Sequence, residues 1–126
     1  MPTKRVLVID DEADIRAIIR GCLEDIAEWK VFTAASGEEG IQLAITEQPD
    51  GILMDVSMPG MSGLEALHKL QEESKTRMIP VVFLTAKALL EEQEIFTTLA
   101  IAGVVVKPFD PMTLVDQVTG VFGWNS

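Results

Sequence analysis

The chain has 126 residues, a length that fits one domain, and 48% of them are apolar, which excludes a disordered chain. The formal net charge is −10 and no Lys/Arg cluster is present, so the composition argues against direct binding to nucleic-acid phosphates and favours a cation or a basic protein partner. No apolar stretch approaches the roughly 18 residues of a membrane span, and the acids in VLVIDDE come too early for a signal peptide. We therefore expect a cytoplasmic protein without membrane association.

Two predicted strands enclose an amphipathic helix in the first quarter of the chain. RVLVID (5–10) is rich in β-branched residues, which is typical of a strand, and KVFTA (30–34) has the same character. Apolar residues between them recur at helical spacing and predict a helix from about 13 to 28. The face expected to be buried holds Ile15, Ile18, Ile19, Cys22, Leu23 and Ile26. Cys22 is the only cysteine, so it cannot form an internal disulfide, and we expect it to pack in the core.

Two helices in the middle of the chain begin with the same capping signal. Ser36 and Ser62 are good N-caps, and each is followed three residues later by a glutamate, Glu39 and Glu65. The first of these helices ends before the third predicted strand, GILMD (51–55). The second helix places Leu64, Leu67 and Leu70 on one side.

The last third of the chain predicts two more strands and two more helices. IPVVFLTA (79–86) and GVVVK (103–107) have strand character, and residues 88–100 between them predict a helix with a weaker apolar stripe. Asp110 as N-cap and Pro111 at the first helical position predict a final helix that runs to about residue 122. Its inner face is expected to hold Leu114, Val115, Val118 and Phe122.

Five strands alternate with five helices through short joints. Strongly apolar strands in this alternation are typical of an α/β fold with a parallel sheet that is covered on both faces. Crossover connections are right-handed, so the helices must lie on both sides of the sheet. We found no linker or repeat, and we expect residues 1–126 to form a single domain.

Polar residues follow the strands at the positions where binding sites form in parallel sheets. The first strand ends in Asp10 and Asp11, the third in Asp55, the fourth in Thr85 and the fifth in Lys107. The carboxyl ends of parallel strands lie along one edge of the sheet, so these residues are expected to converge. Taken singly, such residues are more typical of helix caps and turns, and it is their convergence that indicates a functional site.

The converging residues suit phosphoryl transfer. Three carboxylates at one edge repel one another, and Mg²⁺, which prefers oxygen ligands, would relieve that repulsion. Lys107 would add a positive charge and Thr85 a hydroxyl donor, so that a transferred phosphoryl group is neutralised on several oxygens. Asp55 would then be the nucleophile and would form an acyl phosphate.

The loop after Asp55 is consistent with this site. It is rich in turn-forming residues, Pro59, Gly60, Ser62 and Gly63. A backbone carbonyl near Ser57 could therefore face the metal. Met58 and Met61 are expected to pack rather than to bind, because thioethers do not suit Mg²⁺.

The segments VLVIDDE, ILMDVSMPGMSGLEAL, VVFLTA and GVVVKPFDP together resemble the receiver domain of two-component response regulators. The resemblance covers essentially the whole chain. It implies a flavodoxin-like (βα)5 fold with strand order 2-1-3-4-5, and a phosphorelay function in which Asp55 accepts phosphate from a sensor histidine kinase or a histidine phosphotransfer protein. Small donors such as acetyl phosphate are also expected to serve.

The same resemblance implies a role for each matching residue. Asp11 and Asp55 would bind Mg²⁺ directly, Ser57 through its backbone carbonyl and Asp10 through water. Thr85 would turn toward the phosphoryl group and Lys107 would pair with it, and the Lys107–Pro108 bond is expected to be cis. These three side chains, Asp55, Thr85 and Lys107, would let the domain assist its own phosphorylation and dephosphorylation without acting on other substrates.

One position departs from the family pattern. Receivers usually carry Tyr or Phe three residues before the matching lysine, where this chain has Val104. The aromatic ring normally swings inward when the threonine moves, and valine has almost no reach for such a swing. We expect a muted coupling, or coupling through other residues, while the phosphorylation chemistry is retained. Ser57 and Lys87 occupy positions that resemble those that tune phosphate lifetime in the family.

Three alternatives to a phosphorylated receiver were weighed. An aspartyl phosphohydrolase usually carries its nucleophile on the first strand and a second acid two positions later, where this chain has Glu12. A flavin- or nucleotide-binding module needs a Gly/Ser/Thr-rich loop after that strand, whereas DDEAD repels phosphate unless a metal intervenes. A constitutive, degenerate receiver is disfavoured by the complete set of acids, threonine and lysine. Because the last helix ends near the end of the chain, we expect a stand-alone receiver with no output domain, acting on a downstream protein target.

Overall fold

The computed structural model describes residues 3–86 and 99–124. Its centre is a five-stranded parallel sheet in the order β2-β1-β3-β4-β5, which confirms the expected strand order. The strands are β1 (Arg5–Ile9), β2 (Lys30–Ala34), β3 (Gly51–Asp55), β4 (Val81–Ala86) and β5 (Gly103–Lys107). All four pairings are parallel, so the five strands end along the same edge of the sheet.

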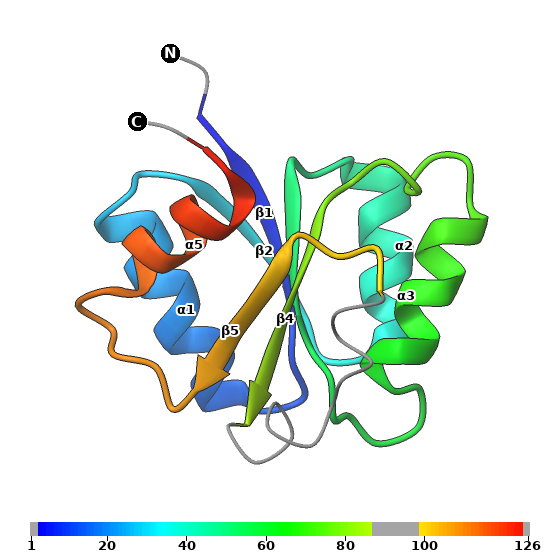
Figure 1. The fold of residues 1–126 in the computed structure, drawn as a ribbon, viewed down its shortest axis with the longest axis horizontal. Helices are drawn as coiled ribbons and strands as arrows, with labels where there is room; N and C mark the ends of the chain where they lie inside the picture. Colours follow the sequence, from blue (N-terminus) through cyan, green and yellow to red (C-terminus); the bar gives the residue numbers. More distant parts are fainter. Residues whose placement is uncertain (1–2, 87–98, 125–126) are drawn as a thin grey trace.

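Helices cover both faces of the sheet (Figure 1). One face carries α1 (Ala13–Asp25) and α5 (Leu114–Phe122), and the other carries α2 (Gly37–Glu47) and α3 (Gly63–Glu72). The helix predicted over 88–100 lies outside the described residues. The described helices are far too short to serve as membrane spans, and none qualifies as one.

The buried strands separate two apolar clusters, one on each face. In β1, Val6 and Val8 belong to the cluster under α1 and α5, whereas Leu7 and Ile9 belong to the cluster under α2 and α3. Alternate strand residues point to opposite faces, and both faces are covered, so β1 is apolar without interruption from Val6 to Ile9. All five residues of β3 are buried, and the last of them is Asp55.

The two predicted capping signals are confirmed. The Ser36 hydroxyl accepts a hydrogen bond from the Glu39 amide at 3.2 Å, and Ser62 accepts one from the Glu65 amide at 3.2 Å. These bonds satisfy amides that have no partner inside the helix. They fix the starts of α2 and α3 beside the carboxyl edge of the sheet.

Helix α1 ends at Asp25, three residues before the predicted end. Glu28 adopts a left-handed conformation with φ 59°, and the Trp29 amide bonds back to the Leu23 carbonyl at 3.1 Å, which closes the helix. The predicted burial of Ile18 and Ile26 is wrong, because these side chains are 42% and 57% exposed. The buried stripe is thus narrower than the sequence spacing suggests.

The predicted start of the last helix is also wrong. Asp110 does not cap α5, which begins at Leu114 with Thr113 in the N-cap position. The Asp110 carboxylate instead accepts a bond from the Met112 amide at 2.9 Å, and its carbonyl accepts one from Thr113 at 3.0 Å. These two bonds close a separate turn before the helix, as Asp side chains often do. Strand β4 begins at Val81, two residues later than predicted.

Candidate functional site

Strand pairing brings the predicted site residues to one edge of the sheet. Ile9 of β1 is paired with Met54 of β3. Asp10 and Asp55, the residues that follow them, therefore lie side by side at the ends of these two strands. Asp55 is in register with Leu84, one residue before Thr85, and Lys107 is in register with Ala86, one residue after it. The convergence expected from the sequence is confirmed.

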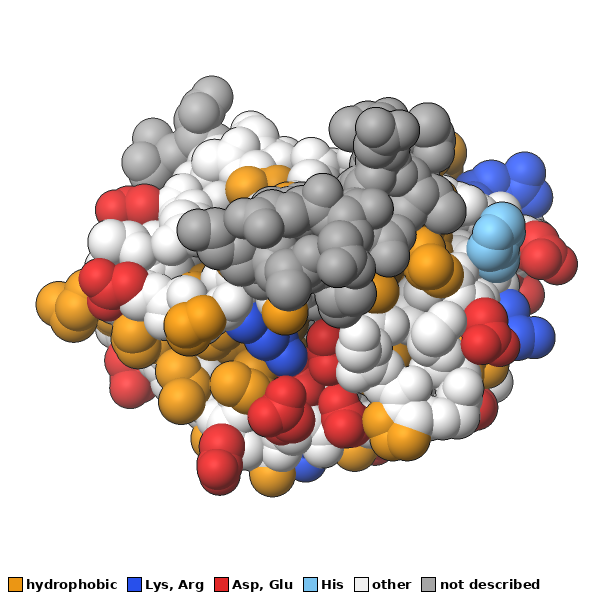
Figure 2. All heavy atoms as spheres, turned by 60° about the horizontal axis from the view of Figure 1, so that its bottom comes forward, with side chains coloured by type: hydrophobic (Ala, Val, Ile, Leu, Met, Phe, Trp, Pro, Cys, Tyr) orange, Lys and Arg blue, Asp and Glu red, His pale blue; other side chains and the backbone are white. Residues whose placement is uncertain are grey.

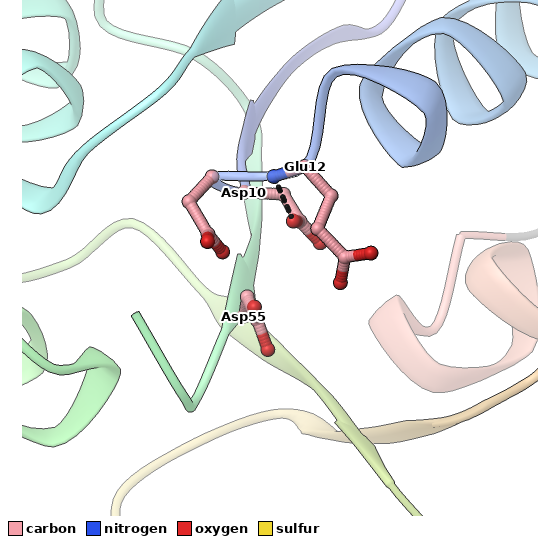
Figure 3. Close-up of side chains that lie close together, drawn as sticks. Asp10, Glu12 and Asp55 are labelled. Atoms are coloured by element: carbon pink, nitrogen blue, oxygen red, sulfur yellow. Dashed lines mark hydrogen bonds between the residues drawn. The ribbon is translucent and has the colours of Figure 1, made fainter. Parts of the chain in front are cut away.

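Four carboxylates form the floor and mouth of this site. Asp10, Asp11, Glu12 and Asp55 each offer a carboxylate oxygen, and these oxygens lie within 4.8 Å of one another. Asp10 and Asp55 are buried, whereas Asp11 and Glu12 are exposed. Figure 3 shows Asp10 and Glu12 at the end of β1 near Asp55 on β3, and Figure 2 shows acidic side chains gathered beside a basic group on this face. The sequence analysis left Glu12 out of the site, although its place in the run DDE was the available signal.

Lys107 lies among these carboxylates. Its Nζ atom is 2.8 Å from Asp10 Oδ2, 3.6 Å from Glu12 Oε1 and 3.6 Å from Asp55 Oδ2. Burial by itself lowers the pKa of the Lys107 ammonium, but the hydrogen bond to Asp10 and the neighbouring negative charges outweigh that effect. The pKa of Lys107 is therefore raised above its ordinary value of 10.5, and the side chain is a permanent cation in this site.

Asp55 is held in an environment that disfavours its charge. Burial raises the pKa of its carboxyl group to about 6 from an ordinary 3.8; the charge of Lys107 opposes this rise and that of Asp10 adds to it. The Ser57 amide donates to Asp55 Oδ1 at 3.3 Å, which favours the charged form more weakly. The residue predicted to be the nucleophile thus carries a negative charge that its burial disfavours.

Asp10 is fixed by contacts on both its side chain and its backbone. Oδ1 accepts the Glu12 amide at 2.8 Å, and Oδ2 accepts Lys107. The Asp10 amide donates to the Ala34 carbonyl at 3.1 Å, and its own carbonyl accepts Arg16 Nη1 at 2.7 Å. The sequence analysis did not single out Arg16, because a backbone contact leaves no residue pattern.

Thr85 and Val104 lie on β4 and β5, the two strands that follow β3 in the sheet. Thr85 is 1% exposed, and its hydroxyl lies 3.4 Å from the Ala86 carbonyl. Val104 is half-buried and in register with Phe83, a fully buried ring on the neighbouring strand. The Lys107–Pro108 bond is cis, as predicted.

The loop after Asp55 is tightly closed. The Gly63 amide donates to the Val56 carbonyl at 2.9 Å, and a Cβ atom on Gly63 would lie 2.5 Å from the Asp55 carbonyl oxygen. Only glycine therefore fits at this position without displacing the backbone of Asp55. Met58 is buried and Met61 packs on the start of α2 at Gly37, so both methionines pack as predicted.

The arrangement fits a hard divalent cation. Carboxylate oxygens are the ligands that Mg²⁺ prefers, and two of the four acids are exposed enough to meet an ion that keeps several waters. One ammonium cannot neutralise four carboxylates, and a divalent cation would stabilise the charge of Asp55, whose pKa is raised by burial and further by the charge of Asp10. A single exposed carboxylate, with no buried carboxylate beside it, would have less need of a cation.

Comparisons with a family model and with known proteins point to the same family. Residues 6–119 match the model of the response regulator receiver domain. The chain is 34% identical over 123 residues to the phosphate regulon transcriptional regulatory protein PhoB of Pseudomonas aeruginosa, covering 96% of this chain and 52% of that protein. It thus spans about half the length of this curated relative.

Solved structures agree with the sequence comparison. The chemotaxis response regulator CheY4 of Vibrio cholerae superposes with a TM-score of 0.86 at 32% identity, covering 95% of this chain and 99% of that one. The receiver domain of a sensor histidine kinase from Pseudomonas aeruginosa, solved with a coordinated magnesium ion, shares the fold at a TM-score of 0.83 and 24% identity, covering 97% and 99%. With the strand order, the acidic edge and these matches in agreement, the chain belongs to the response regulator receiver domains of two-component signalling.

Proposed function

We propose that Asp55 accepts a phosphoryl group from a phosphohistidine donor in a Mg²⁺-dependent reaction, and that this modification switches a protein-interaction surface. The observation that carries the proposal is the buried Asp55 carboxylate, which lies in a cluster of three other acids and 3.6 Å from the Lys107 ammonium. Such a carboxylate gains most from an incoming cation. It is also close to a fixed positive charge that can compensate the added phosphate.

The step itself is a displacement at phosphorus. An oxygen of ionised Asp55 attacks the phosphoryl group, the P–N bond to the donor imidazole breaks, and a P–O bond forms. Lys107 stabilises the phosphoryl oxygens, and Thr85 supplies a hydroxyl donor from the end of β4. A bound Mg²⁺ contributes electrostatic stabilisation of the same oxygens.

Four residues are proposed to hold the metal. Asp11 and Asp55 offer carboxylates, Ser57 offers its backbone carbonyl, and Asp10 acts through water, because its Oδ1 and Oδ2 already accept Glu12 and Lys107. The magnesium ion in the related sensor-kinase receiver supports this assignment. The exposure of Asp11 supports it too, since an exposed carboxylate can replace a water of a hydrated ion.

The partners and setting follow from the same chemistry. The donor is a sensor histidine kinase or a histidine phosphotransfer protein, and the target is a downstream protein rather than nucleic acid or a membrane. The module works in the cytoplasm and has no catalytic activity beyond its own phosphorylation and dephosphorylation. Exposed Ile18 and Met112, 42% and 81% accessible, offer apolar contacts to a docking protein.

Acetyl phosphate with Mg²⁺ tests the proposal directly. Intact-protein mass spectrometry is expected to show one added phosphoryl group, which requires Mg²⁺ and is absent in Asp55→Asn. Asp50→Asn makes the same change of charge next to β3 but at its opposite end, where the carboxylate accepts the Arg5 amide at 2.8 Å, and it is expected to label normally. Labelling that persists in Asp55→Asn would refute the assignment.

A further inference from the structure

Arg16 spans the turn that joins β1 to α1. Its backbone amide donates to the Glu12 carbonyl at 3.1 Å, as in any first helical turn, and its side chain reaches back so that Nη1 donates to the Asp10 carbonyl at 2.7 Å. Two carbonyls of the three-acid segment 10–12 are therefore held by one residue of α1. The carbonyl of Asp10 gains a charged donor, which makes a stronger bond than a neutral one.

This contact completes the restraint of Asp10 described above. Its carboxylate is fixed by Glu12 and Lys107, and its amide by Ala34, so the Arg16 guanidinium holds the remaining polar group of the residue. The next residue is Asp11, whose backbone leaves from that same carbonyl. The direction of the Asp11 side chain therefore depends on a peptide group that Arg16 fixes.

We propose that Arg16 is a positioning residue for the metal site: it orients the Asp10–Asp11 peptide so that both carboxylates face Asp55. The proposal rests on the proposed function, because it concerns the same site. Groups that orient metal ligands without touching the ion commonly change affinity by one to two orders of magnitude when they are removed. Arg16 would orient Asp10 and Asp11 in this way, without touching the ion.

Charge and position make opposite predictions for Arg16. If the guanidinium acted only as a nearby positive charge, its removal would make the site more negative and would tighten the binding of a divalent cation. If it holds the peptide, its removal weakens binding. The sign of the change in metal affinity therefore distinguishes the two roles.

The test compares Arg16→Met with Arg20→Met, two substitutions on α1 that remove the same charge, and with Arg16→Lys, which keeps it. Arg16→Met keeps an apolar stem and removes the donors, and Arg16→Lys keeps the positive charge on a shorter side chain whose N–H donors sit on one nitrogen. Arg20→Met is the matched control, because Arg20 lies one turn further along α1 and pairs with Glu24 at 3.1 Å on the exposed surface. Mn²⁺ serves as the probe ion, and its dissociation constant is measured on the full chain by electron paramagnetic resonance.

We expect Arg16→Met to raise the Mn²⁺ dissociation constant about tenfold, Arg16→Lys to raise it less, and Arg20→Met to leave it unchanged or slightly lower. A second readout needs no metal: the Glu12 amide, which bonds to Asp10 Oδ1, is expected to exchange with solvent faster in Arg16→Met but not in Arg20→Met. Urea unfolding of each variant separates this local effect from global opening. If Arg16→Met does not fold, Arg16→Lys decides the question, because a raised Mn²⁺ dissociation constant in that variant supports the positioning role.

The inference is overturned if the Arg16 variants bind Mn²⁺ as tightly as the control, or more tightly. Weaker binding without faster exchange at Glu12 also overturns it, because the peptide would then not have moved. Neither measurement involves phosphorylation. A failure of Asp55 to accept phosphate would therefore refute the proposed function while leaving the test of Arg16 intact.

Discussion

The two ends of the sheet are built on opposite principles. At the carboxyl end, four carboxylates crowd around Lys107, and burial raises the pKa of Asp55, with the charge of Asp10 adding to the rise. At the amino end, aromatic rings close the sheet with complementary contacts. The unfavourable charge at the carboxyl end is thus available for function, whereas the contacts at the amino end serve stability.

The aromatic end has well-defined ring geometry. Phe122 stacks on Trp124 with centroids 4.3 Å apart, and Trp29 meets Trp124 edge-on at 5.3 Å. Lys4 Nζ lies 4.8 Å from the centre of the Trp124 ring, a cation–π contact. A Cβ atom on Gly51 would lie 2.7 Å from the Phe122 ring, so the rings pack directly on the start of β3.

The largest expected effect comes from removing the cation at the carboxyl end. Lys107→Met leaves Asp10, which is fully buried, without its ion-pair partner, and breaking a buried pair in this way costs about 4 kcal/mol. Urea unfolding in EDTA measures the loss. Mg²⁺ is expected to restore more stability in this variant than in the wild type, and Lys69→Met, on the exposed surface of α3, is the matched control. Equal stability of Lys107→Met and Lys69→Met would show that the acids do not depend on the ammonium.

The next effect concerns the amino end. Trp124→Ala removes the stacked, edge-on and cation–π contacts together, and we expect a loss of about 3 kcal/mol in the free energy of unfolding. Labelling by acetyl phosphate at 25 °C is expected to be unchanged in the folded variant. A slower labelling rate would mean that the two ends of the sheet are coupled, contrary to the division described here.

The smallest effect has the opposite sign. A pKa raised from 3.8 to about 6 means that Asp55 binds its proton more tightly in the folded state; the resulting stabilisation is present below pH ~4 and is lost as the pH rises through about 6. Asp55→Asn avoids that loss, so in EDTA at pH 8 it is expected to be more stable than the wild type, by at most about 3 kcal/mol. The difference should vanish near pH 4.

Urea unfolding at both pH values checks this result. Asp50→Asn, at the amino end of β3, is the control for net charge and is expected to differ from the wild type by less than about 1 kcal/mol at either pH. Parallel stability curves for wild type and Asp55→Asn between pH 4 and 8 would contradict the raised pKa.

The sequence predicted most strand bounds and the starts of α1, α2 and α3, but not the end of α1 or the start of α5. Strands 30–34, 51–55 and 103–107 have the predicted bounds, because short apolar runs between turn residues leave little choice of boundary. The end of α1 could not be predicted, since the residue that terminates it in a left-handed conformation is Glu28 rather than glycine. Asp110 was misassigned for a related reason: the same side chain can cap a helix or close a turn, and only the surrounding backbone decides.

The site shows the same limit. Asp10, Asp55 and Lys107 were predictable because each follows an apolar strand, and strand ends in a parallel sheet converge. Arg16 was not, because its contact with the Asp10 carbonyl depends on how the first turn of α1 folds back over that residue. Glu12 had a signal in the run DDE, but its 3.6 Å distance from Lys107 follows only from the structure. Patterns of residue type thus locate the groups that end strands, while contacts made across a turn require coordinates.

The ion pair between Asp10 and Lys107 joins residues 97 positions apart, and it links the edge strand β5 to β1 across the ends of β3 and β4. A nascent chain on the ribosome that has not yet released residue 107 carries every acid of the site and none of this compensation. The compensation of charge at this edge of the sheet is therefore complete only after β5, the last strand in the sequence, has been synthesised.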